Sequence, residues 1–326
     1  MFRFALLFAL CVAASPACAW GPWAHQLLGQ TGAEDSGLSA KLAVAVASGA
    51  MLADLDHTLA HAGAVGDSPA FAKALAGAHG SSPDSDRFVA GWLAHALVQD
   101  PGQGEISSRD AKMYSDLILV RTVGFPAAGA VYDPERIRAA ARALTGAAPE
   151  AADVTKAAEK LIVLALVESA ALDMVPLELD QPQDGLPSAH SLMPPELKFH
   201  ERRMEESRRG TSSLLAMDLA AAAGQVPPGA ALPSHPADTI GLPPAALMGL
   251  SVKTRVTSGA LTLTTVRLSH PLLFKTAIRV VVHKLGGKLF PTAAAQWHEG
   301  ARVGSVTGAL ADHLGRSAAE LEALFP

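Results

Sequence analysis

Cysteine is almost absent from this sequence. Its 326 residues include two, Cys11 and Cys18, and both lie in the first twenty positions. The rest of the chain therefore has no disulfide scaffold, no cysteine-ligated zinc finger and no thiol nucleophile. A metal ion bound there would have to use nitrogen and oxygen ligands, of which neutral His and Asp are the ordinary pair for zinc.

The two cysteines fall within a segment that has the pattern of a secretory signal. Arg3 precedes an apolar stretch over residues 4–14, and a small-x-small cleavage site follows. The apolar stretch is shorter than the roughly 20 residues that a transmembrane helix needs. We therefore expect residues 1–19 to be removed by cleavage between Ala19 and Trp20, which gives a secreted or periplasmic protein.

Charged residues and long apolar runs are also scarce. Charged residues make up 17% of the chain and hydrophobic residues 49%, a balance typical of a packed globular protein. After residue 19 no apolar run is long enough to predict a transmembrane helix.

One segment concentrates positive charge. Residues 252–302 hold eight Lys/Arg and one acid, Glu299, in a chain of formal charge −5. Apolar residues alternate with these cations, which is typical of a basic amphipathic segment. Such a segment could make peripheral contact with an anionic membrane, attract phosphodiesters in general, or form a core helix with a basic outer face.

Helix-forming patterns cover most of the chain. Two predicted helices begin with an N-cap residue followed by proline, at Ser68 and at Asp133. The period of residues 252–268 fits a strand and a helix equally. Including these two, the predicted helices span residues 38–54, 70–78, 86–99, 135–144, 151–175, 196–223, 270–285, 292–314 and 317–325.

A stretch rich in Pro, Gly and Asp, residues 178–191, marks the best internal boundary. We therefore predict a helical region over residues 20–185. A second, mostly helical C-terminal region follows over residues 186–326 and contains the basic segment.

The start of the processed chain can itself bind a metal ion. Cleavage makes Trp20 the first residue, and its free amine and carbonyl can chelate an ion in a five-membered ring. His25, five residues later, can add an imidazole. An aromatic start that packs on the surface is the ordinary alternative.

Three further polar motifs follow in order. Asp54 closes the apolar helix predicted over residues 38–54, and His79 follows the next predicted helix. Gly91-Trp92-Leu93-Ala94-His95 then places a histidine on an apolar helix that ends at Asp100. A lone histidine on such a helix is more often a core residue, but four such features in sequence favour a metal site.

This order resembles the zinc-dependent phospholipase C family, which shares its fold and metal site with the S1/P1 nucleases. The resemblance covers about residues 20–175, and its specific parts are the Trp20/His25 start and the motif ending at His95. It implies an all-α, multi-helix bundle of the phospholipase C/P1 nuclease type. It also implies that Trp20 and His25 hold one zinc ion, and that Asp54, His79 and His95 hold a second.

The sequence departs from the family at the other ligands. The family's bridging acid lies four residues after the histidine, where this chain has Gln99, so the resemblance assigns the bridge to Asp100. Glu168 fits the acid of the family's third zinc, but Leu164 stands where a histidine is needed. We therefore expect two zinc ions and a lost third site, with Glu168 either supporting the site or serving a structural role.

The resemblance implies a secreted zinc-dependent phosphodiester hydrolase, most similar to phospholipase C. A metal-activated water would attack the phosphate of a phospholipid or another phosphodiester, with Asp54 as the catalytic carboxylate. No specific nucleic-acid partner is expected, because the nuclease histidine beyond the bridging acid is absent. The alternatives are a non-catalytic member that binds lipid or metal, a nuclease-like phosphodiesterase, and an exported membrane-binding protein with fortuitous ligands.

Overall fold

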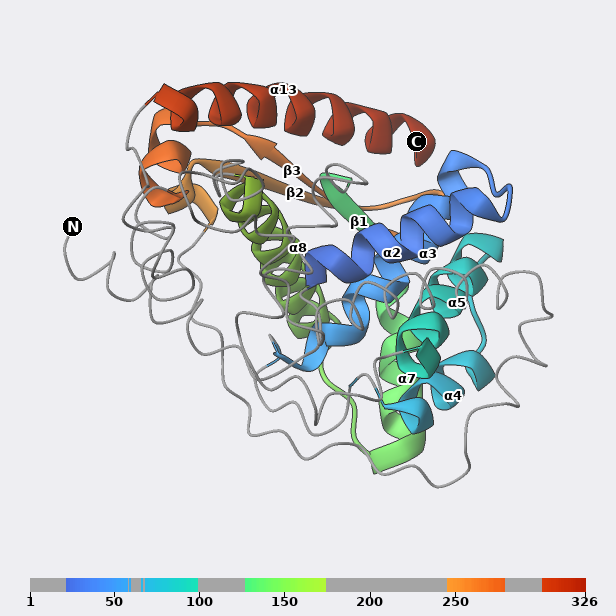
Figure 1. The fold of residues 1–326 in the computed structure, drawn as a ribbon. Coiled ribbons are helices and arrows are strands. Elements are labelled where there is room, and N and C mark those ends of the chain that lie inside the picture. The colour runs from blue at the N-terminus through green and yellow to red at the C-terminus, as the bar shows by residue number, and fades with distance from the viewer. Residues whose placement is uncertain are drawn as a thin grey trace, which may run out of the picture.

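The computed structural model describes residues 22–57, 59, 66, 68–98, 127–173, 245–278 and 301–326. These residues are mostly helical, which confirms the coarse expectation of a helical protein, and they also include a small three-stranded sheet that the all-α prediction did not contain (Figure 1). The helices are α2 (Pro22–Asp35), α3 (Ala40–Leu52), α4 (Pro69–Gly77), α5 (Pro83–Val98), α7 (Pro134–Thr145), α8 (Ala151–Asp173) and α13 (Ala301–Leu324). The described residues also form two 3₁₀ helices, η1 (Ala53–His57) and η3 (Ala245–Met248), and three strands, β1 (Gly129–Tyr132), β2 (Leu250–Val256) and β3 (Thr262–Leu268). Residues 271–278, which lie within the helix predicted over 270–285, are helical as well.

The sheet is antiparallel, with the strand order β1-β3-β2. β2 and β3 form a hairpin, so residues 252–268, whose period left strand and helix open, are strands. β-branched residues dominate β3, and they pack well on a pleated surface. β1 was not predicted, because its four residues, Gly-Ala-Val-Tyr, are too few to show a period.

β1 pairs with β3 along one edge, and side chains from two helices bind its other edge. Gln26 of α2 donates from Nε2 to the carbonyl of Gly129 at 3.0 Å, and the hydroxyl of Ser48 in α3 accepts from the backbone N–H of Val131 at 2.9 Å. Both side chains are buried. They satisfy backbone groups that would otherwise be orphaned at a buried edge, and so they join α2 and α3 to the sheet.

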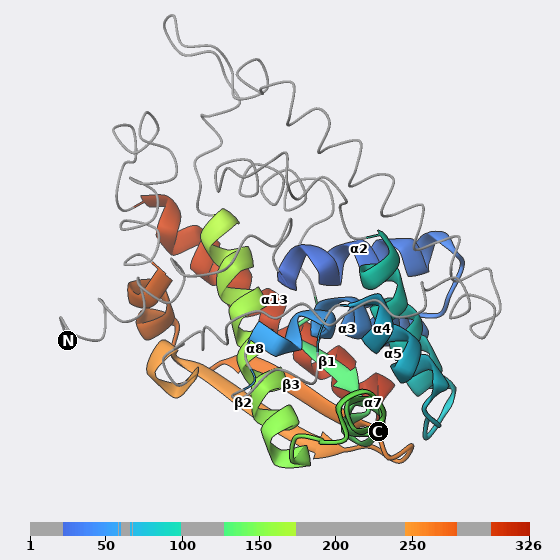
Figure 2. The same cartoon turned by 90° about the horizontal axis from the view of Figure 1, so that it is seen from below.

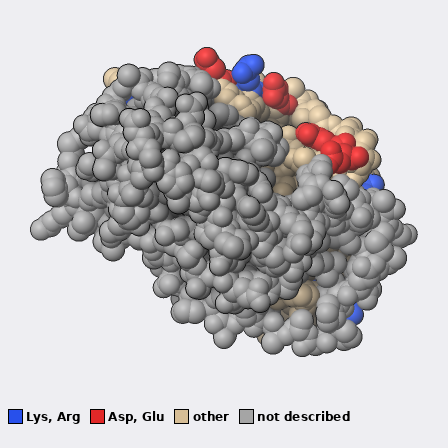
Figure 3. Space-filling view, viewed as in Figure 1, with Lys and Arg blue, Asp and Glu red and all other residues tan. Residues whose placement is uncertain are grey.

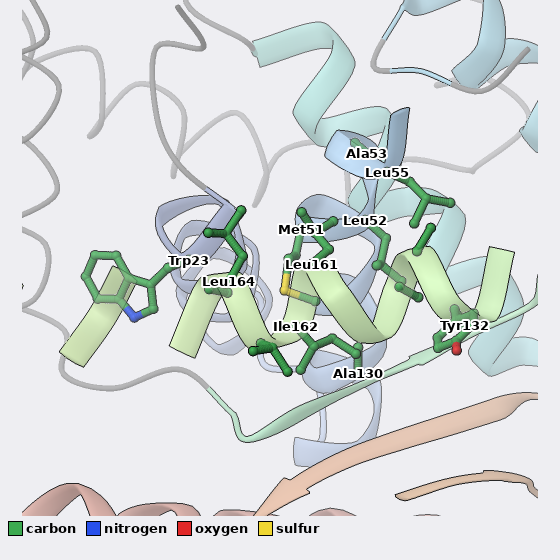
Figure 4. Close-up of a cluster of buried hydrophobic side chains, with 14 of the residues drawn as sticks. Trp23, Met51, Leu52, Ala53, Leu55, Ala130, Tyr132, Leu161, Ile162 and Leu164 are labelled. Atoms are coloured by element: carbon green, nitrogen blue, oxygen red, sulfur yellow. The ribbon is translucent and has the colours of Figure 1, made fainter. Parts of the chain in front are cut away.

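Helices cover both faces of the sheet (Figures 1 and 2). On one face, Val131 and Leu263 pack with Leu321 and Phe325 at the end of α13. On the other face, Ala130 and Val266 join the main core with residues of α8. Figure 4 shows this core around α8, where Leu161, Ile162 and Leu164 lie among side chains of α2, α3 and β1.

The sheet joins residues from both sides of the predicted boundary at residue 185. β1 belongs to the region 20–185, whereas β2 and β3 belong to the region 186–326. The boundary itself lies outside the described residues. From Ala301 on, the helices predicted over 292–314 and 317–325 are one continuous helix, α13, and residues 292–300 lie outside the described residues. No helix among the described residues is long and apolar enough to span a bilayer.

Three cations of the basic segment contact the C-terminal end of α13. Lys253 and Arg267 face the Glu322 carboxylate at 3.8 and 3.2 Å, and Arg255 donates to the carbonyls of Glu322 and Phe325. Cations are favoured there because the last carbonyls of a helix carry partial negative charge. The first part of the predicted basic amphipathic segment is therefore a β-hairpin docked on α13.

The outward face of α13 carries charges of both signs. Asp312, Arg316 and Glu320 are exposed at a spacing of four residues, which places them on one side of the helix. Figure 3 shows acidic and basic atoms side by side along the edge where α13 lies. This face is an ordinary solvated helix surface.

Both predicted N-caps are confirmed. Ser68 Oγ accepts from the N–H of Phe71 at 3.1 Å, and Asp133 Oδ1 accepts from the N–H of Arg136 at 3.0 Å. Arg136 is itself buried, and its guanidinium donates to the carbonyl of Leu75, near the end of α4, and to the Asp86 carboxylate. This charge network fixes the start of α5 against α4 and α7.

A chain of hydroxyl groups connects α8 to the sheet. Thr254 donates to the Glu159 carboxylate at 2.6 Å, so its hydroxyl accepts from Thr264 at 2.9 Å, and Thr264 in turn accepts from Tyr132 at 3.1 Å. The pKa of Tyr132 is raised to about 12, and the largest cause of this shift is the burial of its hydroxyl.

The Tyr132 hydroxyl makes stability depend on pH in the alkaline range. The unfolded tyrosine ionises near pH 10, whereas the folded one stays neutral to about pH 12, so its stabilising contribution is lost as pH rises through that window. We expect the difference in free energy of unfolding between wild type and Tyr132→Phe to fall by about 1.4 kcal/mol per pH unit between pH 10 and 12. Urea unfolding followed by circular dichroism measures it, and parallel pH profiles would contradict the prediction.

Candidate metal centre

Two histidines and an aspartate from three elements meet in the interior. His25 lies on the first turns of α2, Asp54 lies in η1, and His95 lies in the last turn of α5. Their relative exposures are 6%, 1% and 5%. One ligand atom from each residue lies within 4.8 Å of the others, which makes them the one group of three or more potential metal ligands among the described residues.

Asp54 is the centre of the group. Its Oδ2 lies 2.8 Å from His25 Nδ1, and its Oδ1 lies 3.8 Å from His95 Nε2. The two imidazoles meet edge to face, with ring centroids 4.0 Å apart. Each carboxylate oxygen therefore faces one ring.

The end of α3 determines where the carboxylate lies. α3 stops at Leu52, and the chain tightens into η1, so Asp54 follows the last helical turn directly. The backbone N–H of Ala53, the C-cap, donates to the carbonyls of Gly49 and Met51. The carbonyls of this last turn carry partial negative charge. The carbonyl of Ala50, one of them, accepts a hydrogen bond from His95 Nδ1 at 2.9 Å. Carboxylate and carbonyl together make this a favourable place for a cation.

The hydrogen bond to Ala50 also defines the His95 ring. A carbonyl can only accept, so His95 Nδ1 carries the proton, and the lone pair of the neutral ring lies on Nε2, toward Asp54. Histidine ligands in metal sites are commonly oriented by such a bond from their second nitrogen. A lone pair and a carboxylate oxygen repel each other unless a proton or a metal cation lies between them.

The distances suit one ion. A zinc ion has ligand bonds of about 2.0–2.2 Å, so two ligand atoms on opposite sides of it lie at most about 4.2 Å apart. The 2.8 Å and 3.8 Å separations around Asp54 both fall below that limit. A buried carboxylate also requires a compensating positive charge. The group could therefore hold a metal ion.

The structure unites residues that the sequence assigned to two different ions. His25 was expected to hold one zinc with Trp20, and Asp54 and His95 a second, but His25 contacts both Asp54 and His95 directly. His79 is not among them: it lies exposed after the end of α4 and outside the group. His25 lies here because residues 22–35 form the helix α2. The sequence did not predict this helix, because its residues show little amphipathic period.

The remaining predicted ligands lie outside the described residues or partly so. Trp20 and Asp100 belong to segments that the structure does not describe, and Glu168 lies on α8 with its side chain outside the described part. The carbonyl of Ala50 was not predicted. The sequence signal that could have predicted this carbonyl is the end of an apolar helix directly before Asp54. The carbonyls of a last helical turn point out of the end of the helix, toward the site.

A scan against protein-family models finds no match, and searches of curated proteins and of solved structures find none either. The site is therefore interpreted from its own residues.

The three-residue group makes a direct prediction about metal binding. His95→Ala and Asp54→Asn each remove a ligand atom from the centre, so we expect zinc affinity to fall on the order of 100-fold or more, since even losing a supporting contact costs about 10–100-fold. Titration calorimetry with Zn²⁺ measures this. His79→Ala should bind zinc like wild type, as should His270→Ala, a matched change at an exposed histidine. If His79→Ala lowered zinc affinity as much as His95→Ala does, His79 would be a ligand and the prediction would be wrong.

Proposed function

We propose that this chain is a zinc-dependent phosphodiester hydrolase of the phospholipase C type. The observation that carries the proposal is the buried convergence of His25, Asp54 and His95 at the end of α3. Two imidazoles and a carboxylate form a nitrogen and oxygen donor set suited to zinc in a chain without thiols, and three protein ligands leave a position for water or substrate.

The proposed chemistry divides between the ion and the chain. When bound, zinc would supply Lewis acidity toward a phosphoryl oxygen and toward water. Asp54 presents one oxygen to each histidine, so one oxygen can bind the ion while the other orients a water molecule and accepts its proton. His95 keeps its ring orientation through the Ala50 carbonyl. The products would be a phosphomonoester and the alcohol that the phosphate carried.

The resemblance to the zinc-dependent phospholipase C family supports this assignment. Two of the resembling segments, those containing Asp54 and His95, come together in space, and so does His25 from the start of the chain. A mostly helical architecture agrees with the family's bundle at a coarse level. Whether the chain has that particular bundle remains part of the proposal.

A phospholipid is the preferred substrate class. Residues 245–278 contain four cations and no acid. Four large apolar side chains there are exposed: Leu247 at 54%, Val256 at 69%, Leu272 at 78% and Leu273 at 46%. The carbonyl of Gly249 accepts from the N–H groups of Ser269 and His270, which holds the two leucine-bearing segments together. Exposed leucines beside cations are typical of surfaces that bind anionic membranes.

A non-catalytic, metal-binding protein is the second candidate. Two observations favour it: the three ligand side chains are at most 6% exposed, and Leu164 stands where the family's third zinc needs a histidine. A substrate must reach the ion, whereas a structural ion can be fully enclosed. The two candidates differ in turnover and agree on metal content.

Turnover by the zinc-loaded chain beginning at Trp20 tests the hydrolase proposal. We expect hydrolysis of phosphatidylcholine and of bis(4-nitrophenyl) phosphate, and a fall in kcat on the order of 100-fold or more in Asp54→Asn, the range of a lost general base. Asp312→Asn, the same change at an exposed aspartate of α13, serves as the control and should leave kcat unchanged. A wild-type protein that holds zinc but hydrolyses neither substrate would favour the non-catalytic candidate.

Vesicle binding tests the choice of a lipid substrate. Replacing Leu272 and Leu273 together by Ser should weaken binding to vesicles of phosphatidylcholine and phosphatidylserine by about tenfold or more, because two apolar side chains no longer enter the interface. Co-sedimentation measures this. Leu144→Ser alters an exposed leucine of α7 and should bind like wild type. Equal binding by the double variant would remove the support for a lipid surface.

A further inference from the structure

The backbones of α3 and α5 are in contact where the two helices cross, and a glycine of each helix lies at the contact. A Cβ atom added at Gly49 would overlap the carbonyl of Phe88 and lie 2.9 Å from the N atom of Trp92. A Cβ atom added at Gly91 would overlap the carbonyl of Val46 and lie 2.9 Å from the N atom of Ala50. In both cases the obstacle is backbone, which cannot rotate away as a side chain can.

The crossing lies one turn away from the candidate metal centre. Gly91 precedes His95 by four residues, so both lie on the same face of α5. Gly49 lies next to Ala50, whose carbonyl accepts from His95 Nδ1 at 2.9 Å. α3 ends at Leu52, and Asp54 follows two residues later in η1. The reach of His95 to Ala50 and to Asp54 therefore depends on how closely the two helices pack.

We propose that Gly49 and Gly91 are positioning residues for the metal centre, because their lack of side chains sets the distance between His95 and Asp54. A methyl group at either position forces the helices apart. The His95 ring then loses the Ala50 carbonyl, and Nε2 moves away from the Asp54 carboxylate. Gly49, five residues before Asp54, and Gly91, four residues before His95, thus act on metal binding without touching the ion. This inference rests on the proposed use of the group as a metal centre.

Co²⁺ binding, followed by the visible absorption of the bound ion, tests the role of the glycines. We expect Gly49→Ala and Gly91→Ala to bind Co²⁺ at least about tenfold more weakly than wild type and to alter its spectrum, as losses of orienting contacts do. Gly315→Ala is the matched control, because Gly315 lies inside α13 with no atom within 4 Å of an added Cβ. Ile137→Ala, a change in the buried core on α7, controls for lost stability. Neither control should change affinity or spectrum.

A milder variant covers the case in which the α3–α5 variants do not fold. A Cβ atom at Gly29 of α2 would lie 2.9 Å from the Cβ of Ala50, so Gly29→Ala should weaken Co²⁺ binding less, and adding Ala50→Gly should restore part of it. Wild-type affinity in Gly91→Ala, or in Gly29→Ala when Gly91→Ala does not fold, would overturn the proposal. So would an equal loss in Ile137→Ala.

A measurement without metal separates this proposal from the metal centre itself. The ¹⁵N chemical shifts of the His95 ring report the Nδ1–H tautomer and its hydrogen bond in the ion-free protein. If wild type binds no Co²⁺, the metal proposal fails and these shifts decide the positioning role. A changed Nδ1 signal in Gly91→Ala, but not in Gly315→Ala, supports the role of the glycines, and an unchanged signal overturns it.

Discussion

The backbones of α3 and α5 touch at Gly49 and Gly91, and this contact determines much of the remaining architecture. α3 is buried along most of its length because α2, α5 and β1 all pack against it. Its side chains are mostly small, so neighbouring helices approach its backbone directly. Dispersion contacts between backbone atoms then take the place of contacts between large side chains. An interior built on close backbone contact tolerates no added volume, so the residues one turn beyond the crossing have defined positions.

The polar interior depends on the same helix. Ser48 of α3 binds the edge of β1, the carbonyl of Ala50 orients His95, and Asp54 follows the end of the helix. Each of these groups would be costly to bury alone. Because α3 supplies two of these groups and leads directly into the third, the sheet edge and the candidate metal centre are stabilised together.

The C-terminal elements close the fold rather than form a separate unit. Strands β2 and β3 complete the sheet that β1 begins, and α13 covers the face opposite α8. Cations of the hairpin meet the carbonyl end of α13, where the helix dipole favours them. Part of the positive charge that distinguishes this segment in the sequence is therefore used within the protein, and the exposed leucines and remaining cations are what it presents outward.

The sequence by itself determined the helices with strong local signals. Ser68 and Asp133, each followed by proline, begin helices as predicted, because capping is an interaction over three residues and needs no tertiary context. It also determined Asp54 and His95 as candidate ligands, since Asp54 ends an apolar helix and His95 lies on one. Only the tertiary structure decided which residues share a site. The resemblance assigned His79 and His95 to the same ion, yet His79 lies exposed whereas the packing of α5 on α3 buries His95 beside Asp54. The strands were likewise undecided until β1 paired with the edge of β3 and α8 and α13 covered the two faces of the sheet, since these are interactions between distant residues.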